Sequence, residues 1–317
     1  MALRLLVLIC SFAALHALAQ PFPSRPIRLF TGYPPGGSAD FLSRIAADEL
    51  SKDLGVAVVV ENKPGAGGNI AAELVAKSAP DGYTLLNATD KAVNMALYKN
   101  PGYSDKDFTG VSRVAYGPCV IVVNHDSPFR NLKELIDYAR ANPEKLFNAS
   151  AGYGSAPHLA SVLFESVANV KFTSVQFKGG GPATQSLIAG DTQINFPTPP
   201  TVMGFVRSGR LRALAVTQAK ASPAVPGVPG AEQAGLPGYD FRFSFGLYVP
   251  TGTPREIVRR LHAAALKGLS KPEVRDKIAA QGMDAAPSAS PGEFDAEVAA
   301  QVPFWHKLVQ DSGAKVE

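Results

Sequence analysis

Disulfide chemistry is almost absent from this sequence, which holds only two cysteines, Cys10 and Cys119, in 317 residues. Cys10 falls in an N-terminal segment that we expect to be removed, so no intramolecular disulfide is expected in the processed chain. Ile9 stands where lipid attachment at Cys10 would need a small residue, so a lipoprotein is not expected. Cys119 opens the apolar run 119–123, which predicts a buried strand and an inert thiol.

A strong excess of one charge is also missing. Lys and Arg number 31 against 27 Asp and Glu, a net charge of +4, and the two signs alternate along the chain. Without a basic block or a recognition motif, a nucleic-acid partner is not expected. The histidines show no metal-ligand spacing, so no metal site is expected either. They are His16, His125, His158, His262 and His306.

The only long apolar run lies at the start of the chain. Arg4 is the sole charge in the first twenty residues, and the apolar segment 3–15 is too short to span a membrane comfortably. Ala17 and Ala19 are small residues at the positions that a signal peptidase reads. The pattern predicts a signal peptide over residues 1–19, cleaved before Gln20, and hence export to the periplasm.

Strand-like and helix-like patterns alternate along the rest of the chain. We expect a first α/β unit with strands at 26–33, 56–60 and 83–87 and helices at 38–54 and 69–77. A second unit starts near residue 119, with strands at 119–123, 146–150, 172–177, 192–196 and 211–217 and helices after Asn131 and Ser155. A loop is expected at 221–238, and helices are expected to start at 253–256, 270–273 and 290–293. This alternation indicates an α/β protein with mostly parallel sheets.

Glycine-rich turns occur at three places where a strand gives way to a helix: 33–38, 150–158 and 178–182. In open α/β sheets ligands bind beyond the carboxyl ends of the strands, where helix N-termini offer free N–H groups and partial positive charge. The turns match neither the dinucleotide fingerprint nor a P-loop, so no cofactor is expected. Together they predict a cradle for a small anion.

A hydrolase is the enzymatic alternative, because Ser155 and His158 stand three residues apart at a helix start. The Gly-x-Ser-x-Gly elbow is missing, and neighbours on one helical turn point along the same face. We therefore expect Ser155 to be an N-cap or ligand donor, His158 to be a polar wall of the pocket, and the protein not to be an enzyme. Replacing either with alanine is expected to weaken binding without abolishing folding.

Seven motifs spread in order over the chain carry a family resemblance. They are YPPGGSAD (33–40), VENKPGAGGN (60–69), APDGYTLL (79–86), KGGGPA (178–183), SGRLRALAV (208–216), EQAGLPG (232–238) and PTGTP (250–254). The chain resembles the substrate-binding proteins of tripartite tricarboxylate transporters, also called Bug receptors.

The resemblance implies a type II periplasmic-binding-protein fold, with two α/β lobes that close on a ligand. It implies crossover strands near 117–122 and 243–249, one lobe formed by 20–120 and 244–317, and the other by 121–243. The implied ligand is a di- or tricarboxylate, an acidic amino acid or an aromatic carboxylate. The implied partners are integral-membrane transporter subunits, and a monomer is expected.

The candidate ligand-binding residues lie in both lobes, and all except Thr89 and Asp90 are carried over by position from the family resemblance. They are Tyr33, Gly36, Gly37, Ser38, Thr89, Asp90, Tyr153, Gly154, Ser155, His158, Gly179 and Gly180. The chain departs from the family at Gln193, at Phe177 and at 89–91, where Asp90 and Lys91 would favour an amine-bearing or heterocyclic carboxylate if they faced the ligand. A ligand-sensing co-receptor for a membrane signalling protein is the alternative function.

Overall fold

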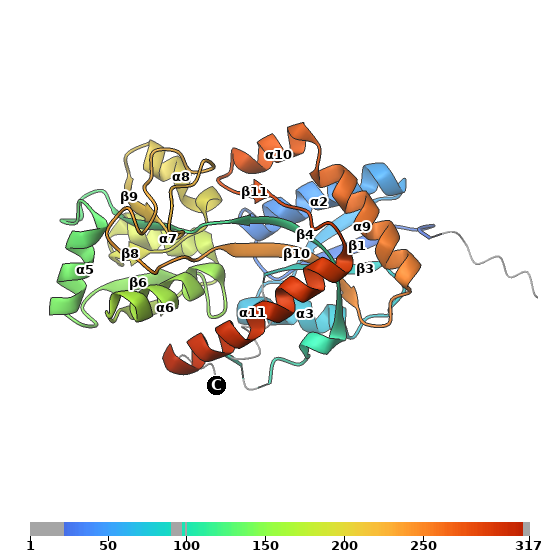
Figure 1. Ribbon diagram of the computed structural model, residues 1–317, viewed down its shortest axis with the longest axis horizontal. Helices are drawn as coiled ribbons and strands as arrows, with labels where there is room; N and C mark the ends of the chain where they lie inside the picture. The colour runs from blue at the N-terminus through green and yellow to red at the C-terminus, as the bar shows by residue number, and fades with distance from the viewer. Residues whose placement is uncertain (1–21, 90–96, 99, 313–317) are drawn as a thin grey trace, which may run out of the picture.

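The computed structural model describes residues 22–89, 97–98 and 100–312. The predicted signal peptide, Asp90 and Lys91 lie outside these residues. Helices and strands form two groups, each built on its own sheet, with β4 and β10 running from one group toward the other (Figure 1). This two-sheet α/β architecture confirms the predicted fold class.

The first sheet has the strand order β11-β4-β10-β3-β1-β2. Strands β1 (Ile27–Thr31), β2 (Val58–Asn62) and β3 (Thr84–Ala88) pair in parallel. Strand β10 (Phe243–Pro250) pairs antiparallel with both β3 and β4 (Phe108–Gly117), and β11 (Asp284–Ala285) pairs antiparallel with β4. The helices of this group are α2 (Ser38–Leu54), α3 (Asn69–Ala76), α9 (Arg255–Leu269), α10 (Pro272–Ala279) and α11 (Pro291–Ser312). The element order makes this a mixed rather than a mostly parallel sheet.

Alternation along the strands of the first sheet divides its core between two faces. Leu29 and Leu85 pack on the face that carries Leu42 of α2, whereas Phe30 and Leu86 pack on the face covered by α3 and α11. All five side chains are buried. Because both faces are covered, the loops at the carboxyl ends of the parallel strands are held at fixed positions.

The second sheet has the order β7-β6-β8-β5-β9. Its strands are β5 (Val120–Asn124), β6 (Phe147–Ser150), β7 (Thr173–Gln176), β8 (Ile194–Asn195) and β9 (Leu211–Val216). Its helices are α5 (Leu132–Ala141), α6 (Ala156–Ala168), α7 (Gly180–Ala189) and α8 (Pro199–Arg207). Cys119, just before β5, is fully buried, and this burial raises the pKa of its thiol well above the ordinary value.

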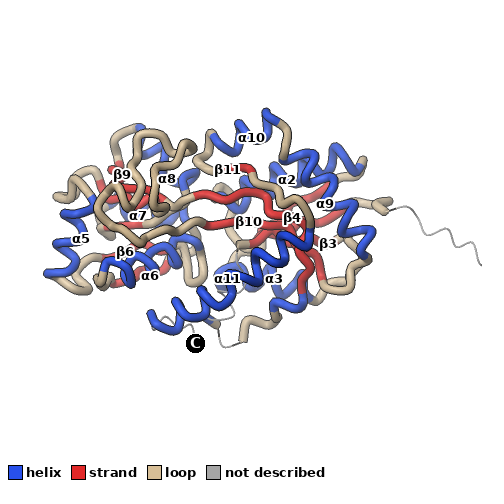
Figure 2. The backbone as a smooth tube through the Cα atoms, viewed as in Figure 1, coloured by secondary structure: helices blue, strands red, loops and turns tan. Residues whose placement is uncertain are grey.

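Helix α11 joins the two groups. It packs against β4 of the first sheet and then against α6 of the second group, and Figure 2 shows it extending along both. Trp305, the only tryptophan, contacts Phe241 edge to face with ring centroids 5.8 Å apart. No helix in the described part of the chain is long and apolar enough to cross a membrane.

Two of the helix caps predicted from the sequence form in the structure, and the cap predicted at Thr253 does not. Asn131 accepts a hydrogen bond from the amide of Glu134, and Ser290 accepts one from Glu293, which confirms both caps. The hydroxyl of Thr253 instead donates to the carbonyl of Pro250, so α9 starts without a side-chain cap. Strands β4 and β11 and helix α8 were not predicted.

Candidate functional site

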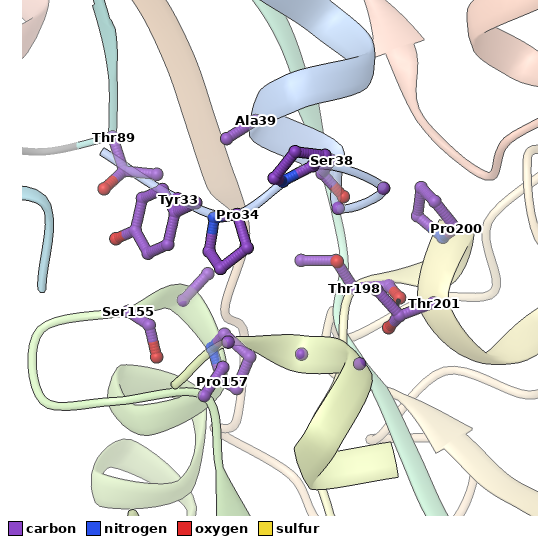
Figure 3. A pocket seen from close by; sticks show the side chains of 18 of the residues that line it. Tyr33, Pro34, Ser38, Ala39, Thr89, Ser155, Pro157, Thr198, Pro200 and Thr201 are labelled. Atoms are coloured by element: carbon purple, nitrogen blue, oxygen red, sulfur yellow. Dashed lines mark hydrogen bonds between the residues drawn. The ribbon is translucent and has the colours of Figure 1, made fainter. Parts of the chain in front are cut away.

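Five loops meet between the two sheets, each following the carboxyl end of a strand. Strand β1 leads into α2, β6 into α6, β7 into α7 and β8 into α8, while Thr89 follows β3. They enclose a cavity of about 340 Å³ lined from both groups of elements. Figure 3 shows Ser38 and Tyr33 on one side of this space and Ser155, Pro157, Thr198 and Thr201 on the other. We call it the interlobe cavity.

The lining of the interlobe cavity is apolar apart from a few hydroxyls and backbone amides. Prolines, glycines, alanines and Phe245 make up most of it, and no charged side chain occurs among the described lining residues. A bound anion would therefore depend on amides and hydroxyls rather than on a lysine or arginine. Phe245 was not among the predicted site residues, because only pairing of β10 with distant strands brings it here.

The start of α2 offers unpaired hydrogen-bond donors to an anion in the cavity. The first intrahelical bond runs from the amide of Phe41 to the carbonyl of Gly37 at 3.0 Å, so the amides of Ser38 and Ala39 have no partner within the helix. The hydroxyl of Ser38 is buried, with 3% of the residue exposed, and has no hydrogen-bond partner in the protein. Such a group is costly unless a ligand or water satisfies it.

The loop before α2 is held in place by Asp40. Its carboxylate accepts hydrogen bonds from Arg44 at 3.0 Å, from the amide of Gly36 at 3.1 Å and from Asn62 at 3.0 Å. Asn62 also donates to the carbonyl of Tyr33. Burial raises the pKa of the Asp40 carboxyl, but the bonds from Arg44, Gly36 and Asn62 outweigh it and lower the pKa overall. The charge of Asp40 is thus neutralised locally, beside the cavity rather than within its lining.

Tyr33 closes one end of the interlobe cavity. Its hydroxyl donates to the carbonyl of Gly67 at 3.1 Å. Burial raises the pKa of its phenol to about 12, although a hydrogen bond with Thr89 opposes the shift. Tyr33 therefore stays neutral, and its ring serves as a wall. Thr89 also lines this end.

Ser155 lines the cavity, but its hydroxyl is already used. It donates to the carbonyl of Gly152 at 2.7 Å and accepts from the amide of His158 at 3.4 Å, which makes it the N-cap of α6. The ring of His158 accepts from the amide of Gly154 instead of facing the Ser155 hydroxyl. The two side chains thus have separate partners and do not form the pair that the hydrolase alternative requires.

Helices α7 and α8 also start at the cavity. Gly179 and Gly180 line it as predicted from the glycine-rich turn, and a Cβ on Gly179 would lie 3.1 Å from Pro34 across the cleft. Thr198, the N-cap of α8, lines the cavity but was not predicted. A threonine followed by two prolines could have indicated this helix start, because proline is favoured at the first helical position.

Three predicted residues are placed elsewhere: Tyr153, Gly154 and His158 do not line the interlobe cavity. Tyr153 and His158 pack edge to face at 5.3 Å and line a second cavity of about 460 Å³ along α6. His158 is buried, and burial lowers its pKa to about 4, so its ring is neutral at pH 7. The rotation of α6 about its axis turns His158 away from the ligand side.

Glu165 lines the second cavity and provides a pH-dependent prediction. Burial raises its pKa to about 7, against opposing effects of Lys171 and the amide of Phe172. Because the pKa in the folded protein exceeds the ordinary value of 4.5, this carboxyl makes the protein progressively less stable as pH rises from about 4.5 through 7. Glu165→Gln removes that effect. We expect it to stabilise the protein by about 1 kcal/mol at pH 8, discounted for partial exposure, and by less at pH 5.

Thermal melts of the Glu165→Gln variant at pH 5 and pH 8 test this directly. Glu232→Gln, at an exposed position, is the control and should leave both melting temperatures unchanged. An equal gain for Glu165→Gln at the two pH values would contradict the assignment.

Comparison with known proteins gives a consistent result over the whole chain. The family model described as "Tripartite tricarboxylate transporter family receptor" matches residues 42–313. Protein BugT of Bordetella pertussis (strain Tohama I) is 34% identical over 324 residues, covering 99% of each chain.

Two solved structures are similar to this one. The structure titled "R. palustris Rpa4515 with adipate" has a TM-score of 0.87 and 33% identity, covering 92% of this chain and 98% of the other. The periplasmic binding protein BugD has a TM-score of 0.86 and 31% identity, covering 93% of this chain and 100% of the other.

Proposed function

Because the chain belongs to the tripartite tricarboxylate transporter receptor family, we propose that it captures a small carboxylate outside the cytoplasm and delivers it, as a monomer, to integral-membrane transporter subunits. The main support for a carboxylate site is that the buried hydroxyl of Ser38, at the start of α2 in the interlobe cavity, has no hydrogen-bond partner in the protein. The adipate in the Rpa4515 structure supports the ligand class.

Backbone donors, rather than cationic side chains, hold the ligand in this proposal. A helix N-terminus normally carries unpaired N–H groups and partial positive charge, and α2 and α7 start at the cavity with such groups. In a cavity shielded from water, hydrogen bonds to an ionised carboxylate are stronger than those between neutral groups. A carboxylate at Ser38 would satisfy both the hydroxyl and the first amides of α2.

The two lobes divide, in this proposal, into 20–120 with 244–317 and 121–243. The membership of β1–β4, β10 and β11 in one sheet and of β5–β9 in the other supports this division. Ligand bound between the lobes favours closure only by its differential affinity for the closed state. Gly179 of one lobe approaches Pro34 of the other so closely that a Cβ on Gly179 would lie 3.1 Å from it, and opening of the lobes would separate the two residues.

A thermal-shift screen of the purified protein tests the carboxylate proposal. The panel holds dicarboxylates, citrate, acidic amino acids and aromatic acids such as nicotinate, each beside its neutral amide. A ligand at a hundred times its dissociation constant stabilises the protein by about 2.7 kcal/mol, which is a shift of several degrees. Acids should shift the melting temperature and amides should not. If amides shift it equally, or if no acid shifts protein stripped of co-purified ligand, the proposal fails.

Delivery requires a second test, on membranes. Ligand-loaded protein should capture the transporter's membrane subunits from solubilised membranes more efficiently than ligand-free protein does. Capture of a signalling protein in their place would contradict the transport role and support the co-receptor alternative.

A further inference from the structure

We infer that the ligand of the interlobe cavity carries one carboxylate on an apolar body, rather than two carboxylates or a carboxylate with an ammonium group. This inference rests on the proposed function and narrows it. It follows from the distribution of unpaired backbone donors around the cavity, because the starts of α2 and α7 offer most of them and proline removes most of them at the starts of α6 and α8.

The donors are concentrated where α2 and α7 start. The amides of Ser38 and Ala39 precede the first intrahelical bond of α2, and the hydroxyl of Ser38 has no partner. In α7 the first intrahelical bond is from Ala183 to Gly179, which leaves the amides of Gly180 and Gly181 without a helical partner. The approach of Gly179 to Pro34 brings these two helix starts face to face. One carboxylate between them reaches donors from both.

Proline occupies one or both of the first two positions in the other two helices. Helix α8 begins with Pro199 and Pro200, which have no N–H group, and the amide of Thr201 already donates to the carbonyl of Thr198. In α6 the second position is Pro157, and the amide of His158 is bonded to the Ser155 hydroxyl, so only the amide of Ala156 has no helical partner in the first turn. Both Pro157 and Pro200 line the cavity. A second carboxylate at the start of α6 or α8 would meet a proline ring and fewer amides than a helix start normally offers.

The rest of the lining that the structure describes offers threonine hydroxyls but no charged partner. Phe245, Ala151, Ala156 and Pro182 are apolar, and no acidic or basic side chain occurs among the described lining residues. A second carboxylate or an ammonium group placed there would lose water without gaining a charged partner, which disfavours binding strongly. An alkyl or aromatic body would instead bury its apolar surface.

Calorimetric titration with hexanoate, adipate and 6-aminohexanoate tests the inference, because these three probes share one six-carbon body. Hexanoate should bind at least about tenfold more tightly than either of the others, since each of them places an additional charge against the lining around Pro157 and Pro200. Benzoate and terephthalate form a second matched pair with the same expectation. Tighter binding of adipate or terephthalate would overturn the inference while supporting the proposed function. Binding of no carboxylate would overturn both.

Pro200→Ala tests the cause of the selectivity. It restores an amide at the second position of α8, where alanine is also a good helix former. The ratio of hexanoate to adipate affinity should fall by about tenfold, because the second carboxylate gains a donor. Pro272→Ala, an exposed proline at the start of α10, is the matched control and should leave the ratio unchanged. Pro157→Ala provides a second variant if Pro200→Ala melts early. Two folded variants with the wild-type ratio would contradict the role of the prolines.

Discussion

Replacing Gly37 with aspartate is expected to weaken carboxylate binding by at least about a hundredfold while leaving the protein as stable as the wild type. Gly37 is the N-cap of α2, with φ −92° and ψ 177°, an extended conformation that any residue adopts. A Cβ built on it meets no atom within 4 Å, and the residue lines the interlobe cavity. The substitution therefore adds a side chain to the cavity without backbone strain.

The aspartate acts as a built-in competitor of the ligand. An N-cap carboxylate accepts hydrogen bonds from the amides of the first helical turn, which are the donors that we assign to the ligand. Its negative charge also repels an incoming carboxylate. Because aspartate is a favourable N-cap, the melting temperature should stay the same or rise slightly.

Two controls separate charge from occupancy in this experiment. Gly37→Asn caps the helix without a charge, so it should weaken binding by only about tenfold. Gly292→Asp adds a carboxylate in the first turn of α11, where a Cβ also meets no atom within 4 Å, and should leave binding unchanged. Calorimetric titration of the three variants provides the affinities. Wild-type affinity in Gly37→Asp would mean that α2 does not hold the anion.

Ser38→Ala is expected to lower affinity by about tenfold to a hundredfold, because it removes a hydrogen bond to an ionised ligand group. In the ligand-free protein the same hydroxyl is buried without a protein partner. Its removal should therefore raise the stability of the ligand-free protein, by about 1 kcal/mol. Urea unfolding with and without ligand measures both effects.

Ser155→Ala is the matched control for Ser38→Ala, because the Ser155 hydroxyl is already bonded to Gly152 and to the amide of His158. These bonds replace the expectation from the sequence alone that this variant weakens binding. This variant should lose about 1 kcal/mol of stability through its cap, with or without ligand. In the ligand-free protein, the two substitutions should therefore change the stability in opposite directions, upward for Ser38→Ala and downward for Ser155→Ala. Destabilisation by both variants would contradict the assignment of Ser38 as a free donor.

The loops around the cavity could be predicted from the sequence where local sequence determines local structure. The glycine-rich turns at 33–38 and 178–182 do precede helices, and α2 begins and ends at the residues predicted for it. The turns also explain why glycine is found at these positions. Gly37 has open space around it, and Gly179 lies close to Pro34. These features depend on few distant contacts.

The placement of His158 depends on packing that no local pattern reveals. Sequence spacing puts it one turn after Ser155, but the rotation of α6 against the second sheet turns its ring into the second cavity beside Tyr153. Phe245 reaches the ligand cavity only because β10 pairs with β3 and β4, which are far away in sequence. Thr198 comes just after the strand predicted at 192–196, but its place in the cavity depends on how the two groups of elements face each other.

A crystal structure of the protein with a bound monocarboxylate such as benzoate tests the central claim most directly. We predict that the carboxylate lies between the starts of α2 and α7, within hydrogen-bond distance of the Ser38 hydroxyl and of amides from both helices, with the ring toward Pro157, Pro200 and Phe245. A carboxylate bound in the second cavity along α6, or held by a charged side chain with the Ser38 hydroxyl still unpaired, would contradict the account.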